Sequence, residues 1–191
     1  MGGLPNPLEA DGIWEGIWFE EAHHSTAIEG NTLVLKQVEA LLLEGRAVGN
    51  KELAEYMEVQ GYAGAAKWVY DQAISPSGTS DRELITLTEV RRVHQLAIGP
   101  SWDVAPHPQA TSDEKPGSFR QHDIKRFPGG MTPPGWTEVP ALLSDWIADA
   151  NRLVPRTLEF PEQIGGLHCR FEQIHPFLDG NGRGGRLVLN L

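Results

Sequence analysis

The chain has 191 residues, of which 40% are hydrophobic, and its formal net charge is −10. A chain of this length can bury its own core, and we expect a single domain over residues 1–191. The acidic balance argues against nucleic-acid binding, because phosphate contacts need a basic surface.

Targeting signals are not expected. The sequence holds no run of about 18 apolar residues that could span a membrane, and its N-terminus, MGGLPNPLEADG, lacks the apolar region of a signal peptide. The single Cys169 excludes an internal disulfide and a cysteine-based zinc site. We therefore expect a cytoplasmic protein without membrane contact.

The first predicted element is an amphipathic helix from about Asp11 to Ile28. Its apolar residues recur at helical spacing, as Ile13, Trp14, Ile17, Trp18 and Ala22. Gly30 suits the position just past the helix end, which places Glu29 at the C-terminus. A carboxylate there opposes the helix dipole at a cost of about 0.3–1 kcal/mol, so a cation is expected beside Glu29.

Hydrophobic periodicity predicts further helices up to the C-terminal region, so the chain is expected to be all-α. Their expected bounds or caps, in chain order, are Leu33 to Leu43 ended by Gly45, Asn50 to about Ala73, a helix capped by Thr86 with Glu89, a helix capped by Thr137, and Pro161 to Gln173. Within them His94, His168 and Cys169 have apolar neighbours at helical spacing. We expect these three residues to pack in the core.

Residues 115–124, KPGSFRQHDI, lie between the Pro- and Gly-rich stretches 106–108 and 128–135. On composition alone this segment is an ordinary surface loop.

The stretch 175–186, HPFLDGNGRGGR, combines an imidazole, a carboxylate, a Gly-Asn-Gly turn and two arginines. Gly180 and Gly182 can adopt backbone conformations closed to other residues, so the N–H groups around Asn181 can converge into an anion-binding nest. The residues that follow become apolar with helical content. The nest is therefore expected at a helix N-terminus, where the dipole reinforces anion binding.

The charged side chains of this stretch suit a nucleotide triphosphate. Arg183 and Arg186 are three residues apart on a helix, and guanidinium groups bind phosphate in bidentate fashion. Asp179 suits Mg²⁺, which prefers one or two carboxylates plus phosphate oxygens, and His175 is a candidate general base. The alternative is a hairpin turn, for which Asp-Gly and Asn-Gly are common, but no alternating strand pattern flanks it.

Residues 175–186 resemble the signature of Fic-domain proteins, H-x-F-x-(D/E)-G-N-G-R-x-x-R, at every specified position. The resemblance implies transfer of AMP from ATP to a Ser, Thr or Tyr hydroxyl of a target protein. The roles it implies are the general base for His175, the Mg²⁺ ligand for Asp179, the anion hole for Gly180, Asn181 and Gly182, phosphate contact for Arg183, γ-phosphate contact for Arg186, and a core anchor for Phe177. In the Doc-like kinases of the superfamily a Lys replaces the second glycine, so Gly182 favours nucleotidyl transfer.

Residues 25–31, STAIEGN, resemble the Fic inhibitory motif (S/T)-x-x-x-E-(G/N). The resemblance implies an inhibitory helix over about residues 11–30 that carries Ser25 and Glu29. In that family the glutamate pairs with the second signature arginine, here Arg186, and displaces the γ-phosphate. One guanidinium group cannot bind both the glutamate carboxylate and the γ-phosphate.

Residues 115–120 are similar to the P-G-x-F/Y-R run that precedes the flap of Fic enzymes, a short β-hairpin that holds the target segment in extended form. The resemblance implies a flap over about 115–127, with Phe119 and Arg120 as target-binding residues.

The resemblance covers nearly the whole chain and implies a Fic-like helical bundle with a short β-hairpin flap. We expect an autoinhibited protein adenylyltransferase that uses ATP, Mg²⁺ and a hydroxyl-bearing protein substrate. Whether it forms a homodimer is left open. The alternatives are a de-AMPylating enzyme that uses Glu29 and a non-enzymatic nucleotide-sensing module. Because Fic proteins normally add a helix after the signature, we expect the chain to be truncated at its C-terminus, which would expose Leu187 and Val188.

Overall fold

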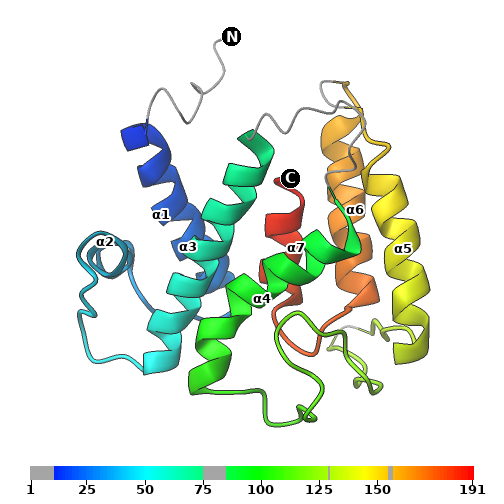
Figure 1. Cartoon of the computed structure of the whole chain (residues 1–191), viewed down its shortest axis with the longest axis horizontal. Helices are drawn as coiled ribbons and strands as arrows, with labels where there is room; N and C mark the ends of the chain where they lie inside the picture. The colour runs from blue at the N-terminus through cyan, green and yellow to red at the C-terminus, as the bar shows by residue number, and fades with distance from the viewer. Residues whose placement is uncertain (1–10, 75–84, 129, 155–156) are drawn as a thin grey trace.

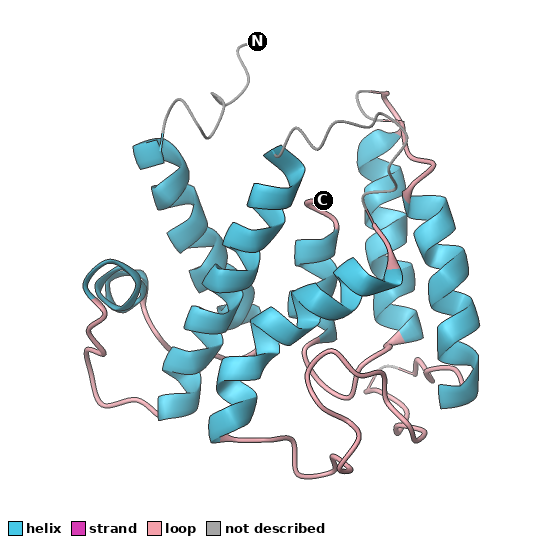
Figure 2. Ribbon diagram, viewed as in Figure 1, coloured by secondary structure: helices cyan, strands magenta, loops and turns pink. Residues whose placement is uncertain are grey.

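The structure is a computed structural model, and it describes residues 11–74, 85–128, 130–154 and 157–191. Over these residues it has seven α-helices, one 3₁₀ turn and no strand (Figure 2). The elements are α1 (Asp11–Ile28), α2 (Leu35–Glu44), α3 (Leu53–Ile74), α4 (Leu87–Val104), η1 (Trp136–Glu138), α5 (Val139–Ala150), α6 (Phe160–Ile174) and α7 (Asn181–Val188). The predicted all-α class is confirmed. None of the described helices combines the length and apolarity that crossing a membrane requires.

The short helix α7 occupies the middle of the bundle (Figure 1). It packs against α3, α4 and α6, while α1 lies along α3 and α5 pairs with α6. One hydrophobic core joins these helices, through residues that include Ala22, Tyr62, Val93, Ile98, Trp146, Phe171 and Leu187. A helix of 8 residues is not stable alone in water, so α7 depends on this packing for its position.

Two contacts fix the helices at close range. A Cβ at Gly61 of α3 would overlap the Ala97 carbonyl oxygen of α4, so the glycine lets the two backbones approach. On the other side of the bundle, the Trp146 indole N–H of α5 donates to the Leu167 carbonyl of α6 at 2.8 Å. These contacts join α3 to α4 and α5 to α6.

The end of α1 follows the prediction. Gly30 has φ +102°, a left-handed conformation that favours glycine. The Gly30 N–H donates to the Ala27 carbonyl at 3.0 Å and the Asn31 N–H donates to the Thr26 carbonyl at 3.2 Å, the bond pattern of a Schellman motif. The motif fixes where the helix stops and places Glu29 on its last turn.

Three predicted caps have different outcomes. Thr86 is the N-cap of α4, where its hydroxyl accepts from the Thr88 N–H at 3.1 Å and also bonds to Glu89, as expected. Asn50 is not a cap, because α3 begins only at Leu53. Thr137 is also wrong as a cap: it lies inside η1, and α5 begins beside Pro140, whose fixed φ suits the first helical turn.

The core assignments are partly corrected. His94 is buried as expected, but Cys169 is exposed and His168 is only partly buried. The buried residues of α6 are Leu167, Phe171 and Ile174, spaced four and three apart, and Cys169 points to the opposite face of the helix. Leu187 and Val188 of α7 are fully buried, so the expected exposure of these residues is also wrong.

The expected β-hairpin at residues 115–127 is corrected, because this segment contains no strand. The Arg120 N–H donates to the Pro176 carbonyl at 3.0 Å, so this backbone bonds to the loop of residues 175–180. At the end of the segment, the Phe127 N–H donates to the Met131 carbonyl at 2.9 Å. The segment is therefore an irregular loop that braces residues 175–180.

Candidate active site

The candidate site is built around the loop that joins α6 to α7, and it begins with an unusual backbone conformation. His175 is the C-terminal cap of α6 with φ 48° and ψ 62°. Among the described residues it is the only non-glycine with positive φ. Such left-handed conformations cost about 1–2 kcal/mol for an L-residue, and they persist where surrounding contacts fix them.

Arg120 supplies those contacts. Its side chain is 1% exposed. Its Nε donates to the His175 carbonyl at 2.9 Å, and its Nη2 donates to the Pro134 carbonyl at 2.6 Å. The expected contact of Arg120 with a target segment is corrected here, because the guanidinium is inside the protein and holds the backbone of the loop.

Two stacked rings hold the middle of the loop. The ring of Phe177, fully buried as the expected core anchor, lies 3.7 Å from that of His94, at an interplanar angle of 12°. His94 Nδ1 accepts from the Gly117 N–H at 2.8 Å, so Nε2 carries the proton and donates to the Asp179 carbonyl at 2.8 Å. Burial lowers the pKa of His94 to about 4. A neutral imidazole therefore joins the 115–127 segment to Asp179.

This arrangement makes the stability of the fold sensitive to acid. The pKa of His94 is about 4 when folded and about 6.5 when unfolded, so the unfolded chain binds more protons between these values. We expect the contribution of neutral His94 to the free energy of unfolding to be complete above pH about 6.5. As the pH drops to about 4, the free energy of unfolding should fall by up to about 3 kcal/mol. Urea melts across this range measure it.

The matched variants for this prediction are His94→Asn and His24→Asn, since His24 is exposed on α1. We expect His94→Asn to be less stable at pH 7 but to lose less stability on acidification than the parent. We expect His24→Asn to behave like the parent. Equal pH slopes for the parent and His94→Asn would contradict the assignment.

Asn181 and Gly180 shape the start of α7. The Asn181 side chain accepts from the Phe177 N–H and donates to the Phe177 carbonyl, both at 2.9 Å, which pins the loop closed. Gly180 has φ +73° and is the N-cap of α7. The first N–H groups of a helix have no intrahelical partner and lie at the positive end of the dipole. The backbone around Asn181 therefore has the features of the predicted anion-binding nest.

Arg186 joins α7 to α1. Its Nε donates to the Ser25 hydroxyl at 2.8 Å, and its Nη2 donates to the Ser25 carbonyl at 3.0 Å and to Glu29 Oε1 at 2.6 Å. The side chains of Arg186 and Glu29 are 24% and 32% exposed. The expected pair of Glu29 and Arg186 is thus present, and Ser25 holds the same guanidinium.

The carboxylate of Glu29 lies beside Gly182, on the first turn of α7. A Cβ added at Gly182 would overlap Glu29 Oε1 and would lie 3.0 Å from Arg186 Nη1. The absence of a side chain at Gly182 therefore admits the carboxylate to the N-terminus of α7. The Glu29 carboxylate thus contacts the arginine for which the resemblance implies γ-phosphate contact.

His175 and Asp179 lie in the same loop. Burial lowers the pKa of His175 below its ordinary value, and this effect outweighs the Glu172 carbonyl and the carboxylates of Asp179 and Glu29, which favour protonation. The His175 ring lies 4.8 Å from that of Phe127. Asp179 is 46% exposed, and its Oδ1 accepts from the Gly180 N–H at 2.6 Å. A neutral imidazole and an accessible carboxylate thus flank the nest.

Some residues of the site gave no signal in the sequence. Glu58 of α3 lies 3.3 Å from Arg183, and Glu172 of α6 lies close to Gly185, with Oε1 lacking a hydrogen bond to the described residues. Burial raises the pKa of Glu172, and the charge of Glu29 adds to this effect. The sequence analysis singles out neither glutamate, and only the packing of α3 and α6 against α7 brings them to the site.

The family assignment rests on a match that includes this whole loop. The model of the Fic/DOC family matches residues 84–191, which is more than half of the chain. The chain belongs to the Fic/DOC family. The matched residues include α4, α5, α6 and α7, while α1, α2 and α3 precede them.

Curated relatives extend the likeness to α1–α3. The chain is 30% identical over 176 residues to "Protein adenylyltransferase Fic" of Nematostella vectensis, and the match covers 91% of the chain and 36% of the relative. It is 29% identical over 173 residues to the protein of the same name from Drosophila melanogaster, with 91% and 32% covered. The chain thus spans about a third of the length of these relatives.

Solved structures agree with the Fic fold. "Fic-1 (aa134 - 508) from C. elegans" has a TM-score of 0.72 at 27% identity, covering 91% of the chain and 46% of that structure. A Fic family protein from Desulfovibrio desulfuricans G20 has a TM-score of 0.63 at 26% identity, with 92% and 47% covered. These likenesses include the N-terminal helices as well as the Fic segment.

Proposed function

We propose that this chain is a protein adenylyltransferase whose activity is restrained by Glu29. The observation that carries the proposal is the position of the Glu29 carboxylate, which bonds to Arg186 at 2.6 Å and lies against Gly182 at the start of α7. A carboxylate is therefore held by a candidate phosphate-binding arginine beside the start of α7. The relatives named protein adenylyltransferase support the reaction class.

The proposed reaction joins a hydroxyl oxygen of the target to the α-phosphorus of ATP. The bond between the α-phosphorus and the oxygen that leads to the β-phosphate breaks, and pyrophosphate leaves. The hydroxyl proton passes to His175, whose lowered pKa keeps the imidazole neutral and able to accept it. The N–H groups around Asn181 and the guanidinium groups of Arg183 and Arg186 stabilise the phosphate charge.

The 115–127 segment has a supporting role in this proposal. Phe127 packs beside the His175 ring, and Phe119 lies 5.5 Å from the ring of Phe177. A target segment that adds to the edge of this loop brings its hydroxyl to His175. Phe119 is partly buried in the core, so contacts to the target come mainly from the backbone of the loop.

The residues present fit a Mg²⁺ ion that arrives with the nucleotide. Asp179 offers one accessible carboxylate beside the nest, and Mg²⁺ prefers such a ligand together with phosphate oxygens. Within the described part of the chain, no cluster of three or more acidic, histidine or cysteine side chains could bind a metal without ATP. When bound, the ion would neutralise phosphate charge during transfer.

Restraint by Glu29 follows from competition for one guanidinium. While Nε and Nη2 of Arg186 are bonded to Ser25 and Glu29, these donors are not available to the γ-phosphate of ATP. ATP then lacks the contact that aligns its α-phosphate for in-line attack. Removal of AMP from a modified protein is the second candidate function, because the partly exposed Glu29 carboxylate borders the nest where it can orient a water molecule.

The metal assignment predicts the behaviour of Asp179→Ala. We expect AMP transfer to fall by at least about 100-fold, because Mg²⁺ loses its carboxylate ligand. Calorimetric titration with ATP should lose its dependence on Mg²⁺, and thermal melting checks that the loop stays folded. Asp71→Ala is a control that removes an exposed carboxylate on α3, where Asp71 pairs with Lys67. Undiminished turnover by Asp179→Ala would remove the metal assignment.

The choice of transferred group is tested with ATP labelled in either the α- or the γ-phosphate. When the Glu29→Gly variant is incubated with Mg²⁺ and either labelled ATP, the proposal predicts that protein in the mixture retains the α label and not the γ label. Retention of the γ label would indicate a kinase. Binding of ATP without retention of either label would favour a nucleotide-sensing module.

A further inference from the structure

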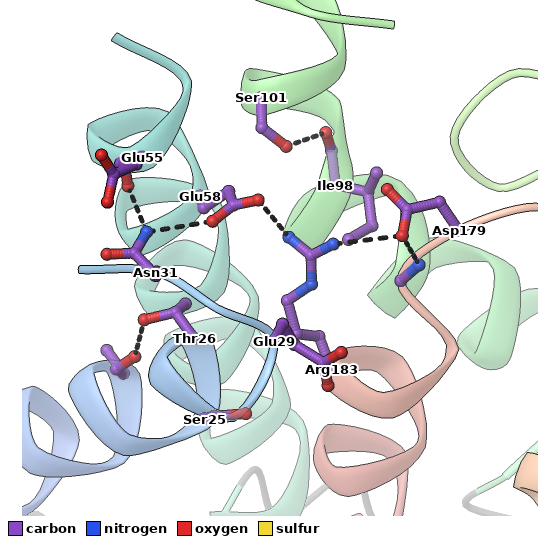
Figure 3. Close-up of polar contacts among 12 residues, drawn as sticks. Ser25, Thr26, Glu29, Asn31, Glu55, Glu58, Ile98, Ser101, Asp179 and Arg183 are labelled. Atoms are coloured by element: carbon purple, nitrogen blue, oxygen red, sulfur yellow. Dashed lines mark hydrogen bonds and ion pairs between the residues drawn. The ribbon is translucent and has the colours of Figure 1, made fainter. Parts of the chain in front are cut away.

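Arg183 of α7 is a buried charge held mainly by two carboxylates. Its side chain is 4% exposed. Nη1 lies 3.3 Å from Glu58 Oε1 and Nη2 lies 3.5 Å from Asp179 Oδ1, so the guanidinium stands between the two acids (Figure 3). Nε and Nη1 have no hydrogen-bond partner among the described residues. The direction of this side chain therefore depends on Glu58 and Asp179.

Glu58 is itself fixed by Asn31. Its second oxygen, Oε2, accepts from Asn31 Nδ2 at 3.0 Å. The same amide nitrogen donates to the Glu55 carbonyl at 2.8 Å, and Asn31 Oδ1 accepts from the Leu33 N–H at 3.0 Å. Because the hydrogen-bonding groups of the Asn31 amide are engaged at both ends, the carboxylate of Glu58 is held with Oε1 turned toward Arg183 (Figure 3).

We propose that Glu58 is a positioning residue for AMP transfer, which holds the guanidinium of Arg183 at the nest and is in turn held by Asn31. This inference rests on the proposed function. Asn31 is the second residue after Glu29, so one carboxylate connects the end of the restraining helix α1 to a phosphate-binding arginine of α7.

Replacing Glu58 should lower the turnover rate more than it weakens ATP binding. An arginine that loses its orienting partner still attracts phosphate, whereas misplacement by about 1 Å can cost about 100-fold in rate. For Glu58→Gln we expect kcat to fall about 10- to 100-fold and KM for ATP to rise by no more than about fivefold. Thermal melting checks that Glu58→Gln is fully folded, because an unfolded fraction would also lower the apparent kcat without changing KM.

The assay uses the full chain with Glu29→Gly, so that restraint by Glu29 does not obscure the effect. The matched control is Glu55→Gln, which makes the same charge change one turn away on α3. Glu55 Oε2 accepts from the Thr32 N–H at 2.7 Å, and Glu55 has no ion pair with Arg183. The control should keep kcat within about twofold of the parent. Equal kcat values for Glu58→Gln and the parent, or equal losses in both variants, would overturn the proposal.

A double-mutant cycle separates this proposal from the proposed function. Calorimetric titration with ATP and Mg²⁺ needs no transfer, so it remains informative if Glu29→Gly fails to modify any protein. Glu58→Gln should weaken ATP binding by about two- to fivefold when Arg183 is present and should have no effect in Arg183→Ala. An equal effect with and without Arg183 would show that Glu58 does not act through it.

Glu58→Asp supplies the test if Glu58→Gln does not fold. Aspartate keeps the charge that Arg183 requires, but it is one methylene shorter and cannot reach both Arg183 and Asn31. The same separation of kcat from KM is expected. Wild-type kcat in a folded Glu58→Asp protein would contradict the proposal.

Discussion

Glu29→Gly should raise the rate of AMP transfer by about 10- to 100-fold, because a hydrogen bond between charged groups contributes about 1.5–3 kcal/mol. The change frees the Arg186 guanidinium, which Glu29 contacts at 2.6 Å, for the γ-phosphate of ATP. Initial rates of α-label incorporation into the chain itself measure the increase. Loss of an ability to remove AMP from a modified protein in this variant would instead favour the reversing reaction.

Two further variants separate release of Arg186 from simple loosening of α1. Glu20→Gly places a glycine inside the same helix at an exposed position, at a cost of about 1 kcal/mol, and leaves the pair of Glu29 and Arg186 in place. It should not raise transfer. Adding Arg186→Ala to Glu29→Gly should abolish the gain, because the γ-phosphate then lacks its guanidinium.

His175→Ala should lower AMP transfer by about 10²–10⁴-fold, which is the usual loss when a general base is removed. ATP affinity should stay nearly unchanged, because the imidazole takes the hydroxyl proton and does not hold phosphate. Rates in the Glu29→Gly background, with ATP binding measured in parallel, provide the test. Transfer at the parent rate would place the base elsewhere.

The pH profile gives a second test of His175. Burial lowers its pKa, so the neutral, proton-accepting form persists below the ordinary histidine value of about 6.5. We expect the rate to rise with pH, to level off below about pH 6.5 and to stay constant through neutrality. A rate that still rises above pH 7 would indicate a base with a higher pKa.

The sequence was sufficient to predict those parts of the site that depend on neighbouring residues in the chain. The Schellman end of α1 follows from Gly30, and the start of α7 follows from Gly180, because each glycine adopts a left-handed conformation at a fixed place in the chain. The pair of Glu29 and Arg186 came from the resemblance to Fic motifs, since two residues so far apart in sequence leave no local signal.

The supporting residues could not be predicted, because their partners are distant in the chain. Arg120 looked like a surface arginine of a flap, and only the fold shows that its guanidinium is buried against the carbonyls of His175 and Pro134. Glu58 carried no signal in the sequence, and only the packing of α3 beside α7 brings it to Arg183. The β-hairpin was expected from resemblance, but the segment bonds to the signature loop instead.

Restraint of AMP transfer by Glu29 is tested most directly by intact-mass spectrometry after incubation with ATP and Mg²⁺. Three proteins are compared: the unchanged chain, Glu29→Gly, and Glu29→Gly with Arg186→Ala. The account predicts abundant AMP adducts on Glu29→Gly and few on the other two. Equal AMP incorporation in the unchanged chain and Glu29→Gly would contradict it and would make Glu29 an ordinary residue at a helix end.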